Sequence, residues 1–241
     1  MKASKVVKQI ALIKTGTTIE KIKPQYGDFE DWFSEGLQLT GLLQVDVFRH
    51  QPLPDPDHID AIVITGSPAM VSSRESWSEK TAQWLSGAVT KGLPTLGICY
   101  GHQLLAHALG GKAGPNPRGR QISTVSTQML DLAKSDPLLG HLPASFLSQA
   151  SHSEVVLELP PGAQRLATSP LDENFSIRYA EKAWGVQFHP EFSAPVMRRY
   201  IELRSEAIKG EGLDPNYLLE KVSDTPEAKT VLKKFVELVR G

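Results

Sequence analysis

Short apolar runs alternate with amphipathic stretches through the first half of the chain, and this alternation restricts the fold more than any other feature. The runs with the character of strands are 10–16, 42–48, 59–66 and 94–98. The stretches with apolar residues at helical spacing are 27–37, 76–92 and 101–111. Strands and helices that alternate in this way predict a parallel sheet with helices on both faces.

The pattern changes after about Arg118, where strands and turns replace the alternation. The segments that favour strands are 120–130, 154–159, 165–169, 175–180 and 183–189. Helical spacing returns at 194–208, 215–222 and 227–239. No internal repeat or low-complexity segment divides the sequence. We therefore expect one domain over residues 1–241, with a helical C-terminal extension from about residue 210.

The composition excludes several classes of partner and cofactor. The 241 residues carry a formal net charge of −1 without a block of like charge, so we expect neither nucleic acid nor an anionic membrane as a partner. No apolar run approaches membrane-spanning length, and Ile10–Ile13 is too short for the core of a signal peptide. One cysteine allows no internal disulfide and no multi-cysteine metal site. We expect a cytoplasmic protein without a metal or cofactor.

The only cysteine, Cys99, stands in a turn between a strand-like run and a helix-like stretch. The sequence Gly97-Ile98-Cys99-Tyr100-Gly101 is the thiol version of the G-x-S-x-G nucleophile elbow. The glycines let backbone segments approach the turn, and the N-terminus of the following helix stabilises a thiolate. Because free cysteine is often buried and inert, a tight turn without catalytic function explains the same five residues.

A thiol nucleophile needs a base, and His189 is the best-placed of the seven histidines. It ends an apolar strand-like run, and Pro190 stops that strand. Glu191 can then fold back toward the imidazole, which gives the order nucleophile, base, carboxylate. A turn that merely ends the strand and starts the next helix near Ala194 is the alternative.

Taken together, these segments resemble the class I (triad) glutamine amidotransferases. "GICYGHQLLA" is similar to the nucleophile segment of that family, and "WGVQFHPE" to its His-x-Glu segment. "VITGSP" (63–68) resembles the loop that contributes to the oxyanion hole. "SHSE" (151–154) resembles the Ser-His-Gly-Asp stretch of GMP synthase amidotransferase domains. The resemblance implies a flavodoxin-like, three-layer α/β/α domain with a central mixed, mostly parallel sheet, and we expect residues 118–175 to supply antiparallel strands at one edge.

The resemblance also implies a mechanism. Cys99 attacks the side-chain amide carbon of glutamine, His189 moves the proton and Glu191 orients His189. The backbone N–H groups of Tyr100 and of the Gly66-Ser67 turn would hold the oxyanion. The attack releases ammonia and leaves a γ-glutamyl thioester, which water hydrolyses.

Four further residues are expected to contact the substrate. Gln103, one helical turn beyond the nucleophile, corresponds to the glutamine contact of the family. Ser151, His152 and Ser153 would meet the α-amino and α-carboxylate groups, partly through their backbone.

The sequence departs from the family pattern at three positions. Ser67 replaces the usual glycine before the proline of the oxyanion turn, so this turn must tolerate a Cβ. Ser153 and Glu154 replace a glycine and an aspartate. A longer acid and an extra hydroxyl suit γ-glutamyl substrates other than free glutamine.

Three functions compete at this point. The first is a stand-alone glutaminase-type amidotransferase that passes ammonia to a separate synthase subunit, since the sequence has no Gly-rich phosphate loop with which to activate a nucleotide itself. The second is a hydrolase of γ-glutamyl peptides or conjugates. The third is a non-catalytic binding or regulatory protein, which has no chemical need for Cys99, His189 and Glu191 together.

Overall fold

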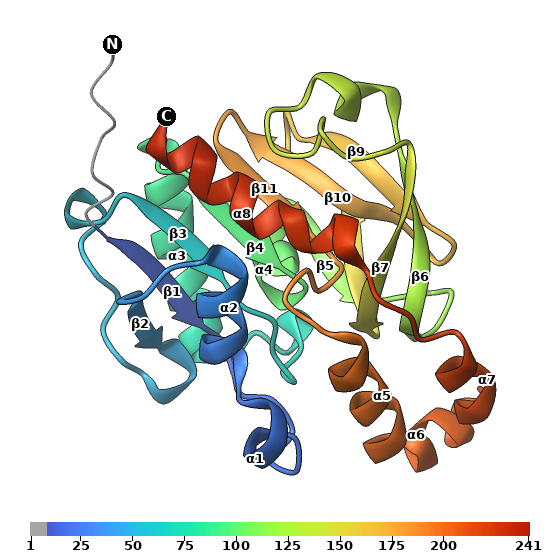
Figure 1. Cartoon of the computed structure of the whole chain (residues 1–241). Coiled ribbons are helices and arrows are strands. Elements are labelled where there is room, and N and C mark those ends of the chain that lie inside the picture. Colours follow the sequence, from blue (N-terminus) through green and yellow to red (C-terminus); the bar gives the residue numbers. More distant parts are fainter. Residues whose placement is uncertain (1–8) are drawn as a thin grey trace.

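A nine-stranded mixed sheet runs through the molecule (Figure 1), whose computed structural model describes residues 9–241. Its strand order is β2-β1-β3-β4-β11-β10-β9-β6-β7. The first five strands in this order are parallel: β2 (Leu43–Asp46), β1 (Ile10–Lys14), β3 (Ala61–Ile64), β4 (Thr95–Ile98) and β11 (Ala183–Val186). The other four are antiparallel: β10 (Asp172–Ala180), β9 (Gln164–Ser169), β6 (Gln121–Met129) and β7 (Ser145–His152). The expected antiparallel edge is confirmed.

Helices cover both faces of the sheet and complete the three expected layers. On one face lie α2 (Phe29–Leu37) and α8 (Pro226–Arg240), which share a core cluster. On the other face lie α3 (Ser76–Thr90) and α4 (Tyr100–Ala108). The α/β fold with its central mixed sheet is therefore confirmed.

The remaining elements are short. They are α1 (Lys23–Tyr26), the two-stranded sheet of β5 (Lys112–Pro115) and β8 (Glu154–Glu158), the helices α5 (Ala194–Leu203), α6 (Ser205–Gly210) and α7 (Pro215–Glu220), and 3-10 turns at Val47–Arg49, Pro56–His58, Val71–Ser73 and Asp131–Ser135. The stretch expected as one helix over 194–208 is broken at Arg204, whose backbone departs from helical angles (φ −106°, ψ 10°).

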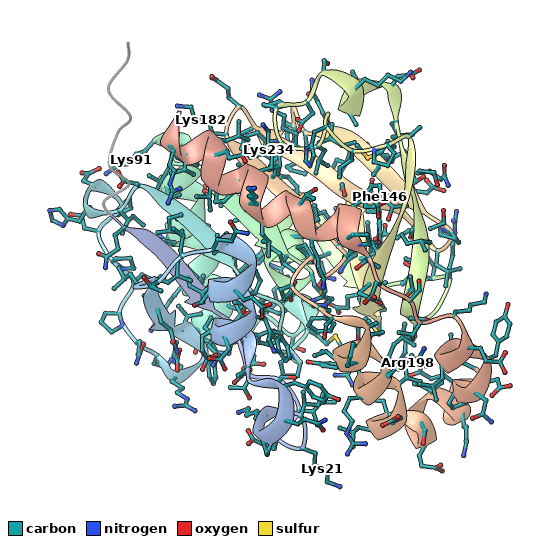
Figure 2. The ribbon with its side chains drawn as sticks, in the orientation of Figure 1. Lys21, Lys91, Phe146, Lys182, Arg198 and Lys234 are labelled. Atoms are coloured by element: carbon teal, nitrogen blue, oxygen red, sulfur yellow. The ribbon has the colours of Figure 1, made fainter. Side chains whose placement is uncertain are left out.

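The last helix belongs to the core of the domain. Leu232 and Phe235 of α8 are fully buried, and a Cβ on Gly36 of α2 would collide with the Leu232 side chain. Figure 2 shows the buried Phe146 of β7 near the first turn of this helix, whereas Lys91 and Lys182 are exposed at the surface. Within residues 9–241, no helix combines the length and apolar character needed to cross a bilayer.

Candidate active site

Cys99 occupies a strained turn between β4 and α4. Its φ of 50° and ψ of −101° lie in a region that residues with a side chain rarely adopt, at a cost of roughly 1–3 kcal/mol. The flanking glycines are required by contact: a Cβ on Gly97 would lie 2.5 Å from the carbonyl group of Gly101, and one on Gly101 would lie 2.6 Å from the carbonyl oxygen of Ile64. The turn therefore has the crowded geometry that its sequence predicts.

His189 and Glu191 follow β11 and contact each other directly. Their Nδ1 and Oε1 atoms are 2.7 Å apart, and both side chains are buried. The ring of Phe192 stacks on the imidazole, with centroids 4.1 Å apart. Burial lowers the pKa of His189, but the charges of Glu191 and Cys99 and hydrogen bonds to both side chains outweigh it and raise this pKa to about 10. The imidazole can therefore hold a proton at neutral pH.

Gly66 brings the turn after β3 against this pair. A Cβ on Gly66 would lie 2.8 Å from Cε1 of His189 and 3.7 Å from Cβ of Cys99. The thiol of Cys99 also lies 3.9 Å from the carbonyl oxygen of Ser151. The ends of β3, β4, β11 and β7 thus meet around Cys99.

The turn at Ser67 accommodates its extra Cβ. The Ser67 hydroxyl donates to the carbonyl oxygen of Thr15 at 2.7 Å and accepts from the N–H of Ala69 at 3.1 Å. The space comes from the opposite chain segment, because a Cβ on Gly16 would lie 2.9 Å from the Ser67 hydroxyl oxygen. The Ser67 side chain, which replaces the glycine usual in the family, therefore stabilises the turn through two hydrogen bonds.

The second expected oxyanion donor is the first residue of a helix. Tyr100 begins α4, so its N–H has no intrahelical acceptor. The side chain of Tyr100 does not contribute to this role: its phenol bonds to the Ser78 hydroxyl at 2.6 Å, and its ring stacks on Trp77. The burial of Tyr100 fixes the start of the helix next to Cys99.

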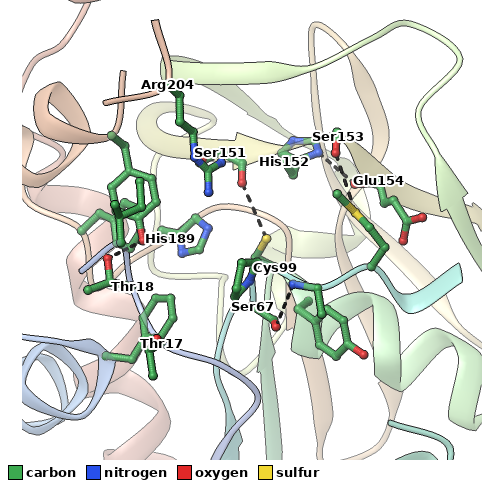
Figure 3. A pocket seen from close by; sticks show the side chains of 18 of the residues that line it. Thr17, Thr18, Ser67, Cys99, Ser151, His152, Ser153, Glu154, His189 and Arg204 are labelled. Atoms are coloured by element: carbon green, nitrogen blue, oxygen red, sulfur yellow. Dashed lines mark hydrogen bonds between the residues drawn. The ribbon is translucent and has the colours of Figure 1, made fainter. Parts of the chain in front are cut away.

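A cavity of about 220 Å³ opens above the thiol (Figure 3). Most of the residues expected from the sequence line it: Ser67, Cys99, Tyr100, Gln103, Ser151, His152, Ser153 and His189. Gly66 and Glu191 are absent from the lining, since Gly66 lies against His189 and the Glu191 carboxylate bonds to its imidazole.

The side chains of Gln103 and His152 are already engaged within the protein. Gln103 donates its amide N–H groups to the carbonyl oxygen of Glu154 at 2.7 Å and to Oε1 of Gln187 at 3.0 Å. The imidazole of His152 contacts the same Glu154 carbonyl oxygen at 3.0 Å and Oε1 of Gln121 at 3.1 Å. Burial lowers the pKa of His152 to about 3, so this ring is neutral. These bonds shape one wall of the cavity.

Glu154 connects that wall to the segment that follows the turn at Ser67. Its buried carboxylate accepts hydrogen bonds from the hydroxyl of Ser72 and from the Ser72 N–H, the latter at 3.3 Å. The hydroxyl of Ser153 contacts Sδ of Met70 at 3.8 Å. Ser153 and Glu154, two of the three positions that depart from the family pattern, therefore both contact the loop after β3.

The cavity lining also contains residues that sequence reasoning missed: Arg204, Arg120, Tyr200 and Thr18. The hydroxyls of Thr18 and Tyr200 are 2.6 Å apart. Arg204 follows a helical stretch that contains two other arginines, so no signal in the sequence distinguishes it from a charge at the surface. It reaches the cavity because the helix breaks after α5.

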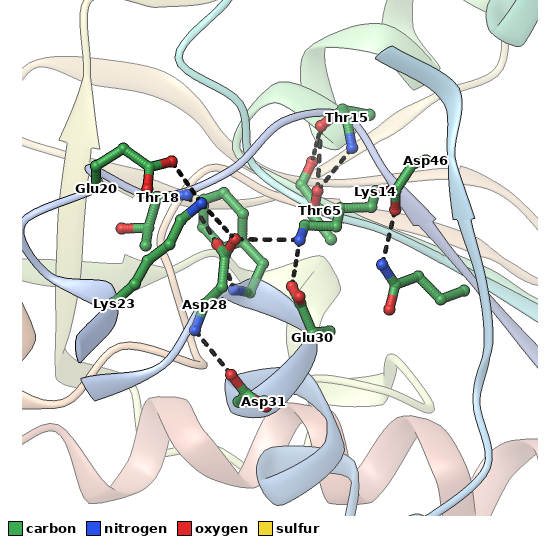
Figure 4. Close-up of polar contacts among 12 residues, drawn as sticks. Lys14, Thr15, Thr18, Glu20, Lys23, Asp28, Glu30, Asp31, Asp46 and Thr65 are labelled. Atoms are coloured by element: carbon green, nitrogen blue, oxygen red, sulfur yellow. Dashed lines mark hydrogen bonds and ion pairs between the residues drawn. The ribbon is translucent and has the colours of Figure 1, made fainter. Parts of the chain in front are cut away.

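A buried ionic network holds the loop that carries Thr18 (Figure 4). The Asp28 carboxylate caps α2 and accepts from the N–H groups of Thr18 and Phe29, both at 2.8 Å. It also accepts from Nζ of Lys14 at 3.1 Å, and Lys14 pairs in addition with Glu30. Burial raises the pKa of Asp28, but these hydrogen bonds outweigh it and lower the pKa below its ordinary value. The network fixes one rim of the cavity.

Among residues 9–241, no cluster of three histidine, cysteine or acidic side chains could hold a metal ion. The chemistry available at the site is that of the thiol, the imidazole–carboxylate pair and the surrounding backbone donors.

Comparison with known proteins identifies the family. The profile of "Glutamine amidotransferase class-I" matches residues 26–204, well over half of the chain. The chain belongs to this family. A glutamine-hydrolyzing GMP synthase subunit from Haloarcula marismortui is 37% identical over 150 residues, covering 61% of this chain and 73% of that protein. Gamma-glutamyl peptidase 5 of Arabidopsis thaliana is 30% identical over 202 residues, covering 81% and 80%.

Two further comparisons show how much of a longer relative the chain matches and which solved structure shares its fold. The GMP synthase of Thermomicrobium roseum is 37% identical over 130 residues, which are 54% of this chain but only 23% of that protein. The crystal structure of a glutamine amidotransferase from Thermotoga maritima superposes with a TM-score of 0.75 at 24% identity, covering 96% of this chain and 98% of that one. The resemblance seen in the sequence motifs is thereby confirmed.

Proposed function

We propose that the protein hydrolyses the side-chain amide of glutamine, or a closely related γ-glutamyl amide, through a thioester on Cys99. The observation that carries this proposal is that Cys99, at its strained elbow, lines the same cavity as His189, whose imidazole bonds to the buried Glu191 carboxylate. Membership of the glutamine amidotransferase family supports glutamine as the source of the γ-glutamyl group.

The proposed reaction has two halves. The Cys99 sulfur attacks the γ-carbonyl carbon with its proton already held by His189, and the N–H groups of Tyr100 and Ser67 bind the oxyanion. The C–N bond then breaks as His189 gives that proton to the leaving nitrogen, which departs as ammonia or an amine. Water attacks the thioester carbon while His189 takes one of its protons; the C–S bond then breaks, glutamate is released, and that proton remains with the regenerated Cys99–His189 pair. Glu191 keeps the imidazole oriented throughout.

Ammonia transfer to a separate synthase subunit is the partner-dependent form of this proposal. Its support is that several relatives are named as subunits of a glutamine-hydrolyzing GMP synthase. Gln103 and the backbone of Ser151, His152 and Ser153 would hold the glutamyl group.

Hydrolysis of γ-glutamyl peptides is the second candidate, and a specific observation favours it. Ser153 and Glu154 stand where the family pattern has glycine and aspartate, and Glu154 bonds to Ser72. A relative named as a gamma-glutamyl peptidase aligns over four fifths of this chain.

Product analysis with the purified chain tests the proposal. The chain is incubated separately with glutamine and with γ-glutamyl dipeptides, and glutamate, ammonia and free amino acid are quantified. We expect glutamate from at least one substrate and none from the Cys99→Ser variant above the buffer rate. Undiminished turnover by Cys99→Ser, or no turnover of any γ-glutamyl compound by the wild type, would contradict it.

A further inference from the structure

The cavity contains a guanidinium without a hydrogen-bond or ion-pair partner within residues 9–241. The guanidinium carbon of Arg204 lies 5.2 Å from the centroid of the Tyr200 ring, over which it is placed. Burial lowers the pKa of Arg204, yet a guanidinium stays charged at neutral pH. The neighbouring Arg120 is different, because it binds Glu211 through two hydrogen bonds of 2.7 and 2.8 Å. A half-buried cation without a bonded acidic partner is suited to bind an anion.

The position of Arg204 relative to the thiol shows which part of a substrate it would meet. Figure 3 shows two groups of side chains on either side of Cys99: Thr18 and His189 form the first, and His152, Ser153 and Glu154 form the second. Arg204 lies above His189 in this view, with Ser151 next to it. The leaving nitrogen must receive its proton from His189, so the leaving group extends toward the first group. The acyl chain then extends toward the second.

Aromatic contacts continue from the imidazole to the guanidinium. Phe192 stacks on His189, Tyr200 lies 4.9 Å from Phe192 between ring centroids, and Arg204 lies over Tyr200. The charge of Cys99 also acts on the pKa of Arg204, which it raises against the effect of burial. The leaving-group side of the cavity is thus an apolar wall that ends in a positive charge.

We propose that Arg204 binds a carboxylate on the leaving group, so that the preferred substrates are γ-glutamyl amides of amino acids or peptides. This inference rests on the proposed thioester chemistry and names its substrate class. Ammonia, the leaving group of glutamine, has no carboxylate that this arginine could bind. A planar carboxylate matches the guanidinium fork and replaces the missing acidic partner. Arg120, whose positive charge acts on Arg204, also lines the cavity.

The test compares two substrates that differ only in this carboxylate. Wild type, Arg204→Gln and Arg204→Lys are assayed for kcat/KM with γ-glutamylglycine and with γ-glutamylglycinamide, whose carboxylate is capped. In the wild type we expect the free carboxylate to be preferred by at least ~10-fold, the size of a charge-assisted hydrogen bond. Arg204→Gln should bring the ratio close to one, and Arg204→Lys should retain part of the preference.

Arg199 provides the matched control. It lies on α5 five residues before Arg204, but its side chain is 37% exposed and pairs with Glu202. Arg199→Gln should keep the wild-type ratio. A ratio that Arg204→Gln leaves unchanged, or a wild type without preference, would overturn the inference while hydrolysis of the capped substrate still upheld the thioester chemistry. Failure of the wild type on both substrates and on glutamine would instead overturn the proposed function, and the inference with it.

Discussion

Two regions meet at the cavity, and they are built in different ways. The ends of β3, β4 and β11 hold Gly66, Cys99 and His189 through backbone conformation and glycine contacts too close for any side chain. The segment from α5 to α6 instead covers the cavity with the side chains of Tyr200 and Arg204. The difference indicates that the strand ends determine whether the reaction occurs, whereas the helical cover determines what reacts. Substitutions at the strand ends should therefore lower kcat, and those in the cover should change KM.

The largest effect is expected from Glu191→Gln, at the strand ends. The amide leaves the size of the side chain unchanged but removes the charge that most strongly raises the pKa of His189 against burial. We expect kcat to fall by ~10²–10⁴-fold, as when the orienting carboxylate of a triad is lost. The wild-type profile of kcat/KM should lose activity as pH rises through the His189 pKa of about 10, and this alkaline limb should move to lower pH in the variant.

The same pKa has a consequence for stability with a defined sign. Because the pKa of His189 is raised from 6.5 to about 10 on folding, its contribution to stability is fully present below pH 6.5 and is lost as pH rises through about 10. Glu191→Gln should flatten this alkaline loss. An unchanged alkaline limb in both activity and denaturant unfolding would show that Glu191 does not control the imidazole.

A smaller effect is expected from Gly101→Ala in the elbow. The added Cβ would lie 2.6 Å from the Ile64 carbonyl oxygen and 2.7 Å from the Ile64 Cβ. Relieving this overlap should cost ~1–3 kcal/mol in the free energy of unfolding and lower kcat as the turn shifts. Gly87→Ala is the control, since nothing lies within 4 Å of its added Cβ in α3 and the helix should gain ~0.5–1 kcal/mol. Equal stability of both variants in urea titrations would show that the turn at Cys99 has room for a side chain at Gly101.

The smallest effect is expected where the cover is tied to the loop at Thr18. Thr18→Val removes the 2.6 Å hydrogen bond to the Tyr200 hydroxyl while keeping the shape of the side chain. Losing one such bond should raise KM by roughly 2- to 10-fold and leave kcat nearly unchanged. Thr90→Val, on the exposed end of α3, is the matched control. A fall in kcat without a change in KM would contradict the division between the two regions.

The strand ends are largely predictable from the sequence because local rules determine them. The alternation of apolar runs predicts the parallel strands, and the glycines around Cys99 predict a crowded turn, which the contacts of Gly97 and Gly101 bear out geometrically. Whether these residues act as the resemblance implies stays a prediction.

The rest of the site depends on contacts between distant segments, which no local pattern records. The sequence pattern does not reveal β7, because both of its faces are buried and carry polar residues: Ser148 and Gln149, on opposite faces, form hydrogen bonds to Thr127 and Thr124 that compensate their burial. The predicted strand over 42–48 ends at Asp46, where the chain enters a 3-10 turn. Arg204 reaches the cavity only because the predicted helix breaks beside it.

The central claim is that a γ-glutamyl group becomes bonded to the Cys99 sulfur, and intact-mass analysis of acid-quenched reactions tests it most directly. The wild type mixed with a γ-glutamyl substrate should show a transient adduct that peptide mapping places on Cys99, that hydroxylamine removes and that Cys99→Ser lacks. Continuous substrate turnover without any adduct, or an adduct that survives in Cys99→Ser, would contradict the account.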